Sequence, residues 1–71
     1  MTATWPQRDG NPVSCTEKLK TLNENQAELA QVMQDAFDDA LLMGVDEAAI
    51  RGRIQALLDA LRSPLQRPAG Q

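Results

Sequence analysis

Apolar residues, interrupted by one glutamine, recur along the middle of the chain at alternating steps of four and three. On a helix this spacing places them on one face, in the heptad-like pattern of a helix that packs along its whole length. We call this row the seam. Its members are Cys15, Leu19, Leu22, Gln26, Leu29, Met33, Ala36, Ala40 and Met43. The seam predicts one long helix over residues 15–43.

Local signals support both ends of this helix. Ser14 and Glu17 have the spacing of a capping box at its start. Gly44 suits the left-handed residue that commonly follows the last helical turn. Inside the helix, Asn25 and Glu28 imitate a second cap, so a break near Asn25, which would give three helices, stays open as an alternative.

A second, shorter helix is predicted over residues 47–62. Asp46 is a favourable N-cap before it, and Pro64 follows its end. Because only two or three residues join the two helices, we expect them to form an antiparallel hairpin.

The expected fold class is therefore all-α. The helical hairpin would occupy residues 14–63. We predict a flexible arm over residues 1–13, which contain two prolines and a glycine. We predict a flexible tail over residues 64–71.

The two predicted helices differ too much in length for one to cover the other. At about 1.5 Å per residue the long helix measures roughly 43 Å and the short one roughly 24 Å. The short helix would reach back to about Ala27 and leave Leu19 and Leu22 facing water. Since each fully buried leucine contributes about 1.5–3 kcal/mol, we expect a second copy of the chain to cover them. Two antiparallel hairpins would then form a four-helix bundle.

The predicted dimer interface consists of Leu19, Leu22, Gln26, Leu29 and Met33. Gln26 either fixes the register of the packing or lies at its edge and reaches water. The pattern is equally compatible with packing against a different protein. The arrangement resembles Rop-like dimers of helical hairpins in architecture alone, and no motif carries over. RNA binding of that type needs a basic face, which the long helix lacks.

The negative charge of the long helix argues against nucleic acid as a partner. The net charge is −3, and the long helix alone carries −4, since its two lysines are outnumbered by six carboxylates. Binding to nucleic acid depends on Lys and Arg neutralising phosphates, so we do not expect it here.

Two features are candidate contacts for an unidentified protein partner. The first is the acidic patch, which consists of Asp35, Asp38 and Asp39. It is interpreted either as a solvated face or as a docking site for a basic protein surface. The second is Trp5 in the arm, because tryptophan often anchors protein interfaces. The alternative is that Trp5 is disordered, as residues near a terminus often are.

Few side chains in the sequence are of the types that catalyse reactions or bind metals. The chain has no histidine and one cysteine, which removes the usual catalytic base, the commonest metal ligand and any internal disulfide. We therefore expect no enzyme activity, no cofactor and no metal site. Cys15 is the one reactive candidate, because the first turn of a helix favours a thiolate. The alternative is that Cys15 is a small buried hydrophobe on the seam.

These patterns favour a small non-enzymatic interaction protein, a dimeric adaptor, regulator or accessory factor of a larger complex. The alternative is a thiol-based redox or metal-handling module centred on Cys15. A third interpretation is an antitoxin-like protein whose tails fold onto a target.

The expected location is a bacterial cytoplasm. The first residues lack the pattern of a signal peptide, and no apolar run approaches the roughly 18–20 residues that span a bilayer. The lone cysteine points to a reducing compartment.

Overall fold

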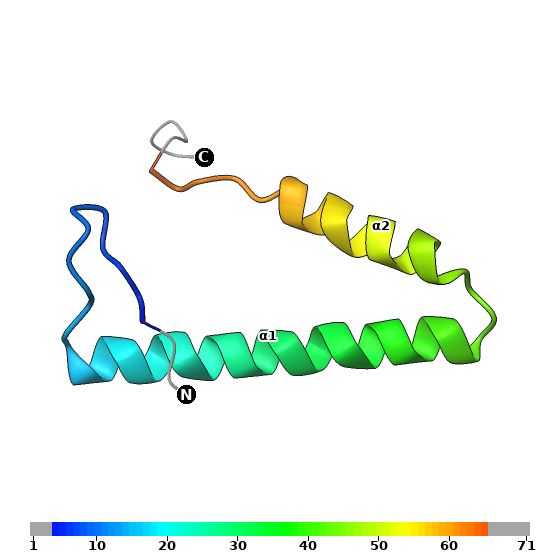
Figure 1. Cartoon of the computed structure of the whole chain (residues 1–71), viewed down its shortest axis with the longest axis horizontal. Helices are drawn as coiled ribbons and strands as arrows, with labels where there is room; N and C mark the ends of the chain where they lie inside the picture. Colours follow the sequence, from blue (N-terminus) through cyan, green and yellow to red (C-terminus); the bar gives the residue numbers. More distant parts are fainter. Residues whose placement is uncertain (1–3, 66–71) are drawn as a thin grey trace. The chain divides into compact units, whose positions relative to one another are not determined.

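The computed structural model of the chain describes residues 4–65 (Figure 1). This part contains two helices, α1 (Thr16–Leu42) and α2 (Glu47–Asp59), and no strand. The all-α prediction is confirmed, and the two helices with a short turn between them are consistent with a helical hairpin. The chain divides into an N-terminal unit of residues 1–34 and a C-terminal unit of residues 35–71. Residues 1–3 of the predicted arm and 66–71 of the predicted tail lie outside the described residues.

Helix α1 runs for 27 residues without interruption, so it does not break near Asn25. The carbonyl of Cys15 accepts from the Leu19 N–H at 2.9 Å. This bond makes Cys15 the N-cap residue, one position later than the predicted Ser14. The cap-like spacing of Asn25 and Glu28 does not end the helix, because helix formers on both sides keep the intrahelical bonds continuous.

In the N-terminal unit, residues 5–13 form a small turn-back beside the first part of α1, which we call the N-terminal loop (Figure 1). The Val13 N–H donates to the Trp5 carbonyl at 2.7 Å, and the Gln7 N–H donates to the Asn11 carbonyl at 2.7 Å. Gly10 closes the turn with φ +91°, a backbone conformation that suits glycine. The sequence pattern did not indicate this loop.

Trp5 joins the N-terminal loop to α1. Its indole Nε1–H donates to the Asn23 side-chain oxygen at 2.8 Å, and the bond is partly buried. The described residues of this unit that are partly shielded from water are Trp5, Val13, Leu19, Leu22 and Asn23. Leu19 and Leu22, expected to face water within a single chain, are thus partly shielded in the unit that contains this contact.

In the C-terminal unit, the end of α1 is closed by a Schellman motif. The Gly44 N–H donates to the Leu41 carbonyl at 3.1 Å, and the Val45 N–H donates to the Ala40 carbonyl at 2.9 Å. Gly44 has φ +91°, as its predicted role requires. Asp46 then caps α2, because its carboxylate accepts from the Ala49 N–H at 3.1 Å.

The first half of α2 packs against the end of α1. Ile50 and Ile54 are partly shielded, as are Phe37 and Ala40 of α1. The Arg51 guanidinium lies 4.9 Å from the centroid of the Phe37 ring, and its Nε–H donates to the Glu47 carboxylate at 3.0 Å. A cation–π contact of this kind contributes about 0.5–1 kcal/mol at an exposed site.

Helix α2 ends at Asp59, three residues before the predicted end. The Leu61 N–H donates to the Leu58 carbonyl at 3.2 Å, a tighter turn that finishes the helix. Pro64 disfavours helical backbone at Ser63. The Ser63 hydroxyl instead accepts from the Leu65 N–H at 3.1 Å, which stabilises a local turn.

Neither unit has a buried core in the part that the structure describes. The large apolar side chains that stay exposed are Leu29, Val32, Met33, Leu41, Leu42, Met43, Val45, Leu57, Leu58, Leu61 and Leu65. Small proteins are stable only if they bury enough apolar surface to offset the loss of chain entropy. The described residues therefore bury little apolar surface within the single chain.

The contact between the N-terminal loop and α1 can be tested with two matched asparagine variants. Asn23→Ala removes the acceptor of the Trp5 indole, whereas Asn25→Ala makes the same change in helix propensity two residues further along α1. We expect Asn23→Ala to lower the free energy of unfolding by about 1 kcal/mol relative to Asn25→Ala. It should also shift the emission of Trp5, the only tryptophan, to longer wavelength. Urea unfolding followed by fluorescence measures both, and equal effects from the two variants would contradict the contact.

Candidate functional site

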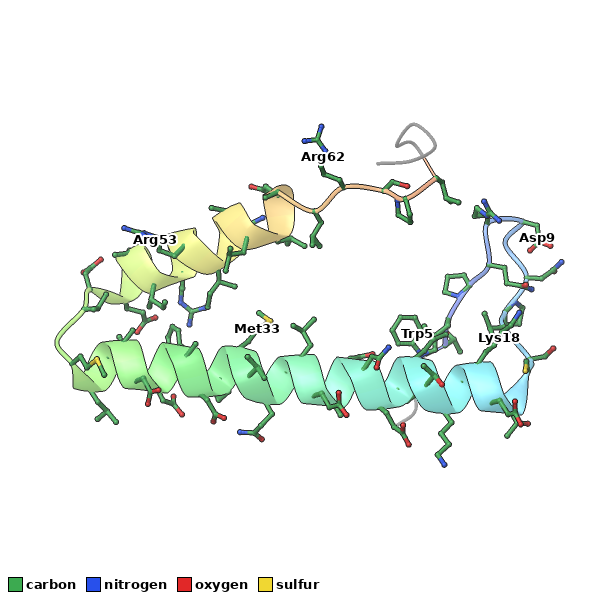
Figure 2. The ribbon with its side chains drawn as sticks, turned by 180° about the vertical axis from the view of Figure 1, so that it is seen from behind. Trp5, Asp9, Lys18, Met33, Arg53 and Arg62 are labelled. Atoms are coloured by element: carbon green, nitrogen blue, oxygen red, sulfur yellow. The ribbon has the colours of Figure 1, made fainter. Side chains whose placement is uncertain are left out.

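The predicted interface residues on α1 divide into a covered and an open group. Leu19 and Leu22 are partly shielded beside the N-terminal loop. Gln26 is exposed, Leu29 is 60% exposed and Met33 is 41% exposed. Figure 2 shows Met33 projecting from α1, whereas Trp5 lies against the helix. The first part of the predicted interface is therefore occupied within the chain, and the rest is open.

Val32, which the sequence analysis did not select, belongs to the open surface and is 64% exposed. Together with its neighbours it forms a row that we call the open row: Leu29, Val32, Ala36 and Met43. These residues follow one another at steps of three, four and seven, so they share one side of α1. The sequence pattern could have indicated this row, because its apolar residues form a second heptad-like series that shares members with the seam.

The carboxylates of α1 gather on the side of the helix away from the seam. At 100° per residue, six side chains fall within about one third of the helix circumference. They are Glu17, Glu24, Glu28, Asp35, Asp38 and Asp39, and we call them the acidic face. Lys20 lies at its border, with its ammonium 4.0 Å from the Glu24 carboxylate.

The acidic patch is exposed and lies near the end of α1, whose last turn carries no basic residue. Carboxylates there meet the negative end of the helix dipole, which is unfavourable for the helix itself. Among the residues that the structure describes, no group of three or more His, Cys, Asp or Glu side chains is placed to hold a metal ion.

Trp5, predicted as a partner contact, is engaged within its own chain through Asn23. Its indole is partly shielded from water rather than displayed on the surface. The structure thus brings Trp5 together with Asn23. The acidic patch belongs to the other unit.

Cys15 is exposed, so in the single chain it is not a buried hydrophobe of the seam. Hydrogen bonds from the backbone N–H of Lys18, and then of Glu17, lower the pKa of its thiol below the ordinary value of 9.0. The nearby Lys18 ammonium adds a smaller effect in the same direction. These are the donors that an N-cap side chain meets at the start of a helix. The thiolate can therefore react with oxidants or electrophiles, although no histidine is available as a base.

Comparison with known proteins adds no further guide to function. No protein family, no curated protein and no solved structure matches the chain. Within residues 4–65, neither helix has the length and apolarity needed to cross a membrane.

The reactivity of Cys15 should follow its lowered pKa. Because backbone donors favour the thiolate, we expect the pH profile of alkylation by iodoacetamide to have its midpoint below 9.0. The matched control is the double variant Cys15→Ser/Ser14→Cys, which moves the thiol one residue away from the cap. Its midpoint should be higher. Identical profiles for the two proteins would contradict the assigned capping role.

Proposed function

We propose that this protein is a small non-enzymatic interaction protein, a homodimeric adaptor or regulator that presents an acidic face to a protein partner. One observation carries the proposal. No described residue is buried, although both helices carry large apolar side chains. A chain of this kind gains stability by associating.

The small number of helices supports association. A helical hairpin alone cannot enclose a core, because a side chain between two helices still meets water on both flanks. Four helices can enclose one.

The acidic face fits a role in docking. Since the carboxylates lie on the side of α1 away from the seam, packing along the seam leaves them in water. A dimer would therefore keep two acidic surfaces exposed to water, where a basic partner could reach them. Complementary charge of this kind favours rapid and specific encounter.

Self-association can be tested with a pair of serine variants and a matched control. We expect light scattering to give the wild-type chain twice its mass of 7.8 kDa at micromolar concentration. Leu29→Ser combined with Met33→Ser removes apolar contacts worth about 1.5–3 kcal/mol each, so the dissociation constant should rise at least a hundredfold.

The control for these variants is Leu42→Ser. This leucine is also exposed, but it lies on the side of α1 away from the seam. It should leave the mass unchanged. A compact wild-type chain of single mass would contradict the dimer.

The acidic patch is tested by charge reversal. Replacing Asp35, Asp38 and Asp39 with lysine should weaken capture of the native protein partner at least tenfold, measured by quantitative affinity capture from cells. Lysine near the end of a helix favours the dipole, so the fold should not suffer. The matched control reverses Glu17, Glu24 and Glu28 at the other end of the acidic face. Equal capture by both variants and the wild type would remove the patch as the contact.

A second candidate function is favoured by the exposed Cys15 thiol and its lowered pKa. In this alternative the protein is a thiol-based redox or metal-handling module. Cys15→Ser would then abolish activity in the cell while helix content and mass stay unchanged. An unaltered phenotype would remove the alternative.

A further inference from the structure

We propose that Asp9 is a site of spontaneous modification, where the chain isomerises to an isoaspartyl linkage, and that the hydrogen bonds of the N-terminal loop set the rate. The inference goes beyond the proposed function and does not depend on it. It concerns the N-terminal unit alone.

The chemistry lies in Asp9 followed by Gly10. The main-chain nitrogen after an aspartate can attack the side-chain carboxyl carbon, and a side chain on the following residue hinders its approach. Asp9 is the only aspartate or asparagine in the sequence that precedes a glycine. Both residues are exposed, and beyond the chain neighbours no heavy atom lies within 4 Å of the place where a Cβ on Gly10 would be. The amide is therefore uncrowded and open to water.

The reaction needs no reagent other than water. The Gly10 nitrogen forms a bond to Cγ of the protonated Asp9 carboxyl group, and the amide hydrogen leaves with the carboxyl hydroxyl as water. The product is a five-membered cyclic imide, in which the nitrogen is bonded to both carbonyl carbons of Asp9. Water then adds to one of them. Addition at the side-chain carbonyl restores aspartate, whereas addition at the main-chain carbonyl leaves the chain running through Cβ and Cγ.

In the folded loop both reacting groups are engaged in other bonds. The Gly10 N–H donates to the Gln7 carbonyl at 2.9 Å, and an Asp9 carboxylate oxygen accepts from the Asn11 N–H at 2.9 Å. The amide has to leave Gln7 before its nitrogen can turn toward the carboxyl carbon. The reaction therefore proceeds from the opened loop, and its rate follows the population of that state.

The contact with α1 limits this opening. The Val13 N–H joins the two ends of the loop by donating to the Trp5 carbonyl at 2.7 Å, and the Trp5 indole donates to Asn23 at 2.8 Å. Figure 2 shows Asp9 at the tip of the loop, whereas Trp5 lies at its base against the helix. Loss of the indole bond therefore raises the open population, and with it the rate of imide formation.

The modification acts back on the loop. An isoaspartyl linkage places one additional carbon in the main chain between Asp9 and Gly10. These residues lie between Gln7 and Asn11, whose N–H and carbonyl are paired at 2.7 Å. A longer main chain no longer fits this pairing. We therefore expect the isoaspartyl form to hold Trp5 less firmly.

The experiment ages the full chain at neutral pH and counts isoaspartyl groups with protein isoaspartyl methyltransferase and labelled S-adenosylmethionine. The variants are Asn23→Ala, its matched control Asn25→Ala, and Asp9→Glu, whose longer side chain forms a cyclic imide far more slowly. We expect Asn23→Ala to gain label about fivefold faster than the wild type and Asn25→Ala, the factor that corresponds to one lost hydrogen bond. In concentrated urea these three proteins should react at one rate, and Asp9→Glu should stay at background.

The isoaspartyl form of the wild type is then separated by chromatography, and we expect its Trp5 emission at longer wavelength than that of the fresh chain. Unchanged emission would overturn the effect on the loop. Equal labelling of Asp9→Glu and the wild type would overturn Asp9 as the site. Equal rates for folded Asn23→Ala and Asn25→Ala would overturn control by the loop contact. Label gained by the wild type in urea but not in the folded state would overturn modification of the native chain.

Discussion

The hydrogen bond from the Trp5 indole to the Asn23 side chain ties the N-terminal loop to the long helix. It holds the N-terminal loop beside the first turns of α1, where Leu19 and Leu22 are partly shielded. Among the described residues of α1, the exposed large apolar side chains begin at Leu29.

The chain separates two kinds of surface on one helix. The seam carries apolar side chains, and the acidic face carries six carboxylates on the opposite side. Because helix geometry keeps these sides apart, a contact made through the seam would leave the carboxylates exposed.

Cys15 has one role in the sequence pattern and another in the structure. Its spacing makes it the first member of the seam, which suggested a small buried hydrophobe. The structure makes it the N-cap of α1, exposed and hydrogen-bonded to backbone N–H groups that lower the pKa of its thiol. The helix begins one residue later than the capping-box spacing indicated. That shift moves the thiol from the side of the helix to its end.

The sequence by itself determined both helices, the Gly44 turn and the Asp46 cap, because each depends on residues within four or five positions of one another. It did not determine the N-terminal loop, because Trp5 and Asn23 are 18 residues apart and no local pattern links them. Nor did it show that Leu19 and Leu22 are covered while Leu29 and Val32 stay open. Periodicity shows which side of a helix is apolar. Only the tertiary structure decides which chain segment shields it, since that depends on contacts between segments distant in sequence.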